Sequence, residues 1–209
     1  MTLQEQYKII ASNNILLINN IVVYICSTFN ISIEEYISNI KYYTKRILFE
    51  IKNNNNKAAE LRLERRKVRD DLEDLERANC KSPNMNPVGE GKNTGGKPNN
   101  EEIRQIQKLE LKEKLGALLL ESQLLEKSLE GNNELIRKLI NLIPKTQFIQ
   151  VLILTYLHCM SNTEIAIELN YGIEYVDQAR HRGLIDMVKI IKECVIIVGE
   201  VKLWKRFYS

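Results

Sequence analysis

Two long series of apolar residues, spaced alternately three and four positions apart, constrain the fold of this 209-residue chain more than any other feature. The first series begins at Ile37 and ends at Leu75, and the second begins at Leu111 and ends at Ile143. This spacing places the apolar side chains along one stripe of a helix, as in helices that pack side by side in coiled coils. We therefore expect two long helices that pack on each other along these stripes.

The first of these helices has a clear start signal and one weak point. Ser32 and Glu35 have the spacing of a capping box, so the helix is predicted to begin at Ile33 and to run to Ala78. The run Asn53–Asn56 is a weak helix former within it. We expect this run to hinge or break the helix if any part does.

Residues 79–100 separate the two series and hold three of the four prolines with several Gly and Asn. This composition predicts a flexible loop, so residues 31–143 are expected to form a long antiparallel, coiled-coil-like hairpin. The stretch from Gly91 to Lys97 matches the start of a phosphate-binding loop. No strand precedes it and Pro98 replaces the hydroxyl that would hold Mg²⁺, so we interpret it as a linker and expect no cofactor.

The first thirty residues predict two shorter helices, at about residues 3–12 and 14–27. This N-terminal extension, residues 1–30, either shields the apolar stripes or forms a dimer interface, and the sequence leaves both open. Its apolar stretch is interrupted by Asn19 and Asn20 and is shorter than the roughly 20 residues of a membrane span. We expect neither a signal peptide nor a membrane helix.

Charge and cysteine content narrow the function classes. The 30 Lys and Arg exceed the 27 Asp and Glu by only three, so any contact with nucleic acid is expected to be local. The four cysteines lie far apart without a C-x-x-C pair, which favours free thiols in a reducing cytoplasm and indicates no metal site. No nucleophile, base and orienting group are spaced for catalysis, so an enzyme is not expected.

The C-terminal part begins a new helical pattern after Pro144, over "KTQFIQVLILTYLHCM". Ser161 and Glu164 then form a second capping box, which opens a short helix. The pattern predicts that this part, residues 144–193, is a separate all-helical domain, followed by a tail at residues 194–209.

Three residues at characteristic spacing define the turn of this domain. Ala166 is small where a second helix crosses, Asn170 tolerates a left-handed backbone, and Val176 returns to the inner face of the next helix. This spacing is typical of a helix-turn-helix, in which two short helices share one core across a tight turn. The alternative is an ordinary corner between two helices that does not contact DNA.

The segment "VLILTYLHCMSNTEIAIELNYGIEYV" resembles small phage regulators of the RinA and ArpU type, whose C-terminal module is similar to region four of bacterial sigma factors. Upstream, "EEYISNIKYYTKRI" and the Gly- and Pro-rich loop resemble the helical front half of these proteins. The likeness covers about residues 33–190. It implies a sequence-specific DNA-binding regulator of phage or prophage genes, and it does not imply catalysis.

The chain departs from the pattern of this family at five positions. Thr155 replaces the usual Arg, Gly172 replaces a capping Ser, and Gly183 replaces Ala. Cys159 and Asn170 stand where Gly is common. These departures make the chain a divergent member of the family that it resembles.

A helix-turn-helix places the first turns of its second helix on base edges in the major groove. The outer face of residues 173–191 then predicts the DNA contacts, since Val176, Ala179, Gly183, Leu184 and Met187 face the core. Gln178 suits adenine and Glu174 suits cytosine. Asn162 and Thr163, at the start of the preceding helix, suit phosphate. The predicted DNA-binding residues are Asn162, Thr163, Glu174, Tyr175, Gln178, Arg180, His181 and Arg182.

Partners and alternatives complete the prediction. We expect double-stranded DNA as the partner and a homo-oligomer, with a dimer favoured. The tail, with Trp204 and Arg206, either caps the helical core or contacts DNA backbone or RNA polymerase. The alternative functions are a phage packaging adaptor similar to a small terminase, and a module that binds or inhibits another protein through the helical hairpin.

Overall fold

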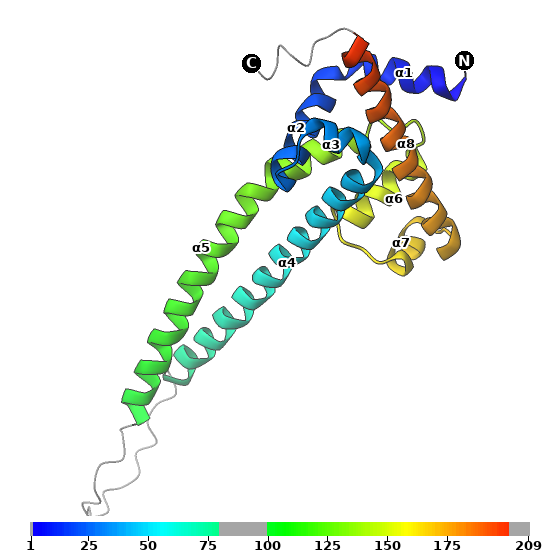
Figure 1. Ribbon diagram of the computed structural model, residues 1–209. Coiled ribbons are helices and arrows are strands. Elements are labelled where there is room, and N and C mark those ends of the chain that lie inside the picture. Colours follow the sequence, from blue (N-terminus) through cyan, green and yellow to red (C-terminus); the bar gives the residue numbers. More distant parts are fainter. Residues whose placement is uncertain (1, 80–99, 201–209) are drawn as a thin grey trace, which may run out of the picture. The chain divides into compact units, whose positions relative to one another are not determined.

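The computed structural model describes residues 2–79 and 100–200, and every regular element in these two ranges is an α-helix. The expected all-α class is therefore confirmed for the described residues. In chain order (Figure 1), the helices are α1 (Leu3–Asn13), α2 (Ile15–Phe29), α3 (Ile33–Ser38), α4 (Ile40–Asn79), α5 (Asn100–Ile140), α6 (Thr146–Tyr156), α7 (Asn162–Leu169) and α8 (Ile173–Glu200).

The described residues form two compact units. The first, called the core unit, contains residues up to Asn56 and from Ser128 onward. The second, called the two-helix unit, lies between Lys57 and Lys127. Both units take residues from α4 and α5, so the division differs from the predicted one, which placed residues 31–143 in a single hairpin.

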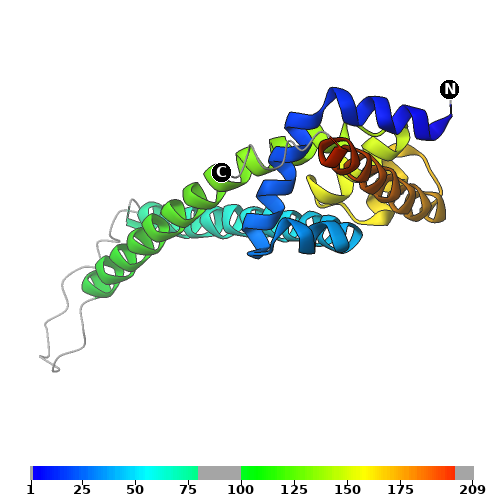
Figure 2. The same cartoon turned by 45° about the horizontal axis from the view of Figure 1, so that its top comes forward.

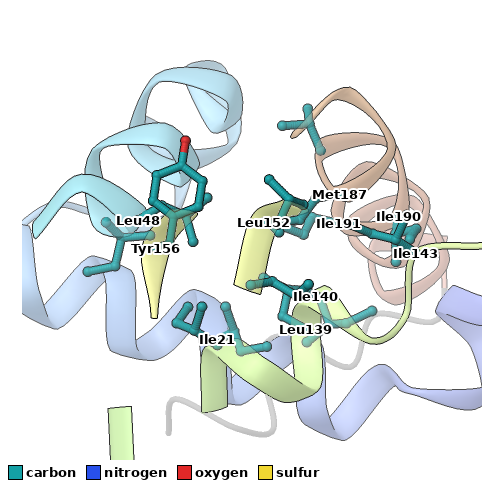
Figure 3. Close-up of a cluster of buried hydrophobic side chains, with 14 of the residues drawn as sticks. Ile21, Leu48, Leu139, Ile140, Ile143, Leu152, Tyr156, Met187, Ile190 and Ile191 are labelled. Carbon is teal, nitrogen blue, oxygen red and sulfur yellow. The ribbon is translucent and has the colours of Figure 1, made fainter. Parts of the chain in front are cut away.

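The core unit is held together by buried apolar side chains that all eight described helices contribute. Figure 3 shows the centre of this cluster, where side chains from α2, α4, α5, α6 and α8 meet around Leu152 and Met187. Burying a side chain of this size contributes roughly 1.5–3 kcal/mol. The labelled members of the cluster are Ile21, Leu48, Leu139, Ile140, Ile143, Leu152, Tyr156, Met187, Ile190 and Ile191.

The N-terminal helices belong to this core. The expected helices are present at nearly the predicted bounds, but residues 1–30 do not form a separate extension. Ile18, Ile21 and Ile25 of α2 are fully buried in the core cluster, and α1 lies against α8 (Figures 1 and 2). These helices are apolar on their inner faces, so they add to the core instead of standing apart from it.

A buried polar pair joins α1 to α8. The hydroxyl of Tyr7 donates a hydrogen bond of 2.6 Å to Oδ1 of Asp186, and both residues are buried. Burial, together with this carboxylate, raises the pKa of the Tyr7 hydroxyl well above its usual value. The ammonium of Lys189 lies 5.4 Å from the centre of the Tyr7 ring. The pair therefore fixes the position at which α1 crosses α8.

None of the described helices is by itself both long and apolar enough to cross a membrane. Taken together, α1 and α2 satisfy the length and composition, but the chain bends by 82° between them.

The long helix expected from Ile33 to Ala78 is broken, but at a different place from the one predicted. It is interrupted at Asn39, between α3 and α4, and continues through Asn53–Asn56. Asn55 explains why the asparagine run stays helical. Its Nδ2 donates to Oδ1 of Asn133 at 3.2 Å and to the carbonyl of Tyr156 at 3.3 Å, so tertiary contacts outweigh its weak helix propensity.

The predicted capping box at Ser32 is half formed. The Ser32 hydroxyl accepts a hydrogen bond from the backbone N–H of Glu35 at 3.1 Å and so caps α3. The Glu35 carboxylate accepts from the hydroxyl of Tyr43 instead of returning to Ser32. Glu35 therefore ties α3 to the first turns of α4.

The two-helix unit has its own small core and a set of ion pairs. Leu61, Val68 and Leu118 are buried there, with Leu111, Leu115 and Leu125 packed against them. Four ion pairs join α4 to α5 at 2.7–3.0 Å: Lys57 to Glu121, Arg62 to Glu126, Glu64 to Lys114 and Glu76 to Lys108. The two pairs that begin earliest on α4 reach the latest residues of α5, and the pair that begins latest reaches the earliest.

Each of the two apolar series contains a polar residue in this unit, Arg65 in the first and Ser122 in the second, and these two residues are in contact. Nη1 of Arg65 donates to the hydroxyl of Ser122 at 3.0 Å, and Ser122 is fully buried. A buried polar group is costly unless it is hydrogen-bonded, so this pairing satisfies both groups. It also fixes the register of α4 against α5, since any shift along the helices would separate the pair.

We expect the substitution Tyr7→Phe to lower the free energy of unfolding by roughly 1–3 kcal/mol, because it leaves the buried Asp186 carboxylate without its hydrogen-bond donor. Urea denaturation followed by circular dichroism measures the change. Tyr42→Phe is the matched control, since Tyr42 is 58% exposed. Equal stabilities of the two variants would contradict the structural role of the Tyr7–Asp186 pair.

Candidate nucleic-acid interface

The first element of the candidate site is α7, whose start is fixed by a complete capping box. Oγ of Ser161 accepts from the backbone N–H of Glu164 at 3.3 Å, and Oε2 of Glu164 accepts from that of Ser161 at 2.7 Å. These hydrogen bonds to Ser161 lower the pKa of Glu164. A lowered carboxyl pKa means that the stabilisation is present above the ordinary pKa of Glu and is lost as the pH falls below it.

The turn between α7 and α8 has the geometry that the sequence predicts. Asn170 has a left-handed backbone, with φ 54° and ψ 46°. The N–H of Tyr171 donates to the carbonyl of Ala166 at 2.9 Å, which closes the last turn of α7. The carbonyl of Gly172 then accepts from the N–H of Val176 at 3.1 Å, and α8 begins at Ile173.

The inner faces of α6, α7 and α8 share one part of the core. Ile165 and Val176 are fully buried, and Ala166 is 7% exposed. At Gly183, α8 approaches α6 so closely that a Cβ would lie 2.9 Å from Cδ1 of Leu152 and 3.2 Å from Cβ of Phe148. Of the residues predicted to face the core, Leu184 is half-buried, and the others are buried: Val176, Ala179, Gly183 and Met187.

The predicted DNA-binding residues lie on the opposite side of α8 and at the start of α7. Asn162 and Arg180 are half-buried. The exposed ones are Thr163, Glu174, Tyr175, Gln178, His181 and Arg182. For the residues on α8, the predicted orientation, outward or at the margin in the case of Arg180, therefore agrees with the structure.

Two of these residues are engaged with each other. The guanidinium of Arg180 contacts the carboxylate of Asp177 and lies 3.4 Å from Oδ1 of Asn162. Arg180 therefore links the start of α7 to α8, and Asp177 offsets part of its charge. This arrangement makes Arg180 a residue that positions the surface as well as a candidate contact.

Tyr175 is also held in place. Its hydroxyl donates to Oε1 of Gln147 in α6 at 3.2 Å, and its ring packs edge-on against that of Tyr171, with the centroids 4.9 Å apart. In contrast, Gln178 and Arg182 form no hydrogen bond or ion pair with the described part of the chain. These two side chains are therefore available to a ligand without loss of an internal contact.

A basic groove next to this surface was missed at the level of sequence. Lys41 and Lys45 of α4 lie beside His181 of α8, in a groove of about 390 Å³ that also includes Lys189 and Lys192. Lys41 and Lys45 belong to α4, whereas Lys189 and Lys192 belong to α8, which is far away in the chain. In the sequence, each of these two pairs indicates only a basic face on its own helix. Tertiary packing alone brings them together.

The C-terminal end of the site differs from the prediction. The tail was expected from residue 194, but α8 continues to Glu200, because Cys194 and Val198 are buried in the core. Core packing thus outweighs the strand propensity of the β-branched residues 195–198. Burial raises the pKa of the Cys194 thiol to about 11. The loop at residues 80–99 and the tail at 201–209 lie outside the described residues, as do Cys80 and Trp204.

Comparison with protein families, with characterised proteins and with solved structures found no match for this chain.

Among residues 2–79 and 100–200, no group of three or more His, Cys, Asp or Glu side chains is placed to hold a metal ion. The geometry of α6–α8 is therefore the evidence on which a function is proposed.

We expect Asn170→Ala to lower the free energy of unfolding by about 1 kcal/mol, because alanine resists a left-handed backbone more than asparagine does. Asn170→Gly is the matched substitution and should be at least as stable as the original chain. Chemical denaturation of the three proteins measures the difference. An alanine variant as stable as the glycine variant would show that the turn does not require this conformation.

Proposed function

We propose that α6, α7 and α8 form a helix-turn-helix that binds double-stranded DNA. The chain is then a sequence-specific transcriptional regulator of phage or prophage genes, similar to region four of sigma factors. One observation carries the proposal. Glu174, Gln178 and Arg182 line an exposed face of the first turns of α8, while the opposite face is buried against α6 and α7.

The chemistry of this face suits base recognition. A recognition helix places its first turns in the major groove, where a glutamine amide pairs with adenine and an arginine pairs with guanine or phosphate. Asn162 and Thr163 lie at the start of α7, where backbone N–H groups favour phosphate. Arg180 connects these two parts of the surface and keeps their spacing fixed.

The backbone supports the resemblance to regulators of the RinA and ArpU type. Cys159 and Asn170 stand where that family commonly has glycine, and both have a left-handed backbone, with φ of 60° and 54°. Glycine adopts this conformation most readily. The left-handed backbone at these two positions therefore explains why the family commonly has glycine there. Gly183, which replaces alanine, lies where α8 comes close to Phe148 and Leu152 of α6.

The two-helix unit completes the proposal. We infer that α4 and α5 form an antiparallel, coiled-coil-like hairpin that sets the oligomeric state, with a dimer favoured. The ion pairs that join the start of this unit on α4 to its end on α5, and the Arg65–Ser122 pair, support this arrangement. RNA polymerase is the proposed protein partner, and the cytoplasm of a bacterial host is the proposed location.

The proposed DNA surface has little net charge. Asp186 is buried against Tyr7 and does not face the ligand. Asp177 offsets Arg180, and the exposed Glu174 balances the exposed Arg182. With so little positive charge, this surface should make few contacts to phosphate. Each such contact steepens the fall of log affinity with log salt by about 0.9, so the DNA affinity should fall only modestly as salt rises.

Replacing Gln178 or Arg182 with alanine should weaken DNA binding by roughly 1–3 kcal/mol, because each removes one contact to a base or phosphate. The DNA duplex for the assay is chosen by sequencing the genomic fragments that the purified protein retains. Fluorescence anisotropy at fixed salt then measures the affinity of each variant for this duplex. Arg66→Ala is the matched control, because it removes an exposed arginine of the two-helix unit. Unchanged affinity in both site variants would refute this placement of the recognition face.

A phage packaging adaptor similar to a small terminase is the second candidate. Leu120 and Leu124 of α5 are 63% and 64% exposed, which favours self-assembly through the two-helix unit. Light scattering separates the candidates, since a ring of many subunits favours packaging and a monomer or dimer favours the regulator. A tight protein complex without DNA binding at low salt would instead favour a module that binds or inhibits another protein.

A further inference from the structure

The groove beside His181 combines charge with an apolar floor. Its floor is formed by Leu184, Ile185 and Val188 of α8, and no carboxylate lines it. We call it the lysine groove. The four lysines along it form no ion pair with any described residue: Lys41, Lys45, Lys189 and Lys192.

This combination defines the chemistry of the occupant. Four ammonium groups attract an anionic ligand, and an apolar floor is stabilised only when the ligand also covers it with apolar groups. A DNA backbone supplies the charge but leaves the floor in water. A helix with glutamates beside exposed aliphatic side chains supplies both, so the groove fits an acidic, amphipathic helix.

The parts of this chain outside the described residues do not have that character. Residues 80–99 contain three lysines and one glutamate, and residues 201–209 contain two lysines, one arginine and no acidic residue. Both segments are therefore basic. Their charge opposes binding in the lysine groove.

A described helix of the same chain does have that character. On α5, Ile103, Ile106 and Leu109 are 37%, 57% and 61% exposed. Glu102, Glu110 and Glu113 are also exposed and form no ion pair with a described residue. Steps of three and four residues connect these six positions, so they share one side of the helix. We call this side the acidic face.

The basic residues of the same segment lie elsewhere on α5. Lys108 pairs with Glu76 at 3.0 Å and Lys114 pairs with Glu64 at 2.9 Å, so both are directed toward α4. The pKa of Glu76 is lowered by Lys108 and, less strongly, by Lys112, which therefore lies near Glu76 as well. Arg104 lies two positions from both Glu102 and Ile106, on the opposite side of the helix. Among the described residues, the acidic face thus has neither an ion-pair partner nor an apolar partner. Its charge and its apolar residues both complement the lysine groove.

We propose that the acidic face of one copy of the chain docks in the lysine groove of a second copy. Each copy carries both surfaces, so reciprocal docking of two copies closes a two-fold dimer, the oligomeric state favoured for the proposed regulator. Docking in one direction only would instead continue into a ring or a filament. This self-association goes beyond DNA binding. The groove shares His181 with the proposed DNA surface, but neither the groove nor the acidic face contains Glu174, Gln178 or Arg182, so the two functions can be tested separately.

Charge reversal on each surface tests the proposal with the full-length chain and without DNA. The groove variant carries Lys41→Glu with Lys45→Glu, and the face variant carries Glu110→Lys with Glu113→Lys. Each alone should associate at least about tenfold more weakly than the original chain in sedimentation velocity, because like charges then oppose each other. Mixing the two variants should restore association, since opposite charges again meet.

Two further variants separate the effect of these surfaces from general effects of charge and folding. Lys8→Glu with Arg66→Glu makes the same charge change at exposed positions outside both surfaces and should associate normally. Ile106→Ser removes an exposed apolar group without changing charge and should also weaken association, with unchanged thermal unfolding.

Three results would overturn the proposal: a wild-type chain that stays monomeric at high concentration, a reversed variant that associates normally, or a mixture that does not recover. A groove variant that loses DNA affinity while it associates normally would assign the groove to DNA instead. DNA binding of the wild-type chain, measured separately, shows whether the proposed regulator function fails on its own.

Discussion

Burial of one side of α8 is the interaction on which the core unit depends. This helix packs against α1, α2, α6 and α7, and its buried residues include Val176, Met187 and Ile191. The same contacts keep its first turns exposed, because a helix buried along one stripe must turn the other to solvent. The proposed recognition face is therefore a consequence of how the core is built.

Hydrogen-bonded polar pairs determine how several helices are positioned on one another. Tyr7 with Asp186, Asn55 with Asn133 and Arg65 with Ser122 each join segments that are distant in the chain. Aliphatic contacts stabilise many registers about equally, whereas a buried polar group is satisfied in very few. These pairs accordingly select one crossing of α1 on α8 and one register of α4 on α5.

The two proposed binding surfaces have different physical characters. The face with Gln178 and Arg182 is polar and carries side chains without internal partners, which suits base edges. The lysine groove has an apolar floor, which suits a helix of a second copy. Because α8 contributes to both, a single rigid helix would connect DNA recognition with self-association in the proposed regulator.

The sequence by itself determined the helical class, the left-handed turn at Asn170 and which side of the first turns of α8 is buried, because these follow from local periodicity and backbone preference. Only the tertiary structure decided that the chain breaks at Asn39, that α8 continues to Glu200, and that Lys41 and Lys192 line one groove. These features depend on contacts between segments distant in the chain, and no local pattern specifies which segments meet.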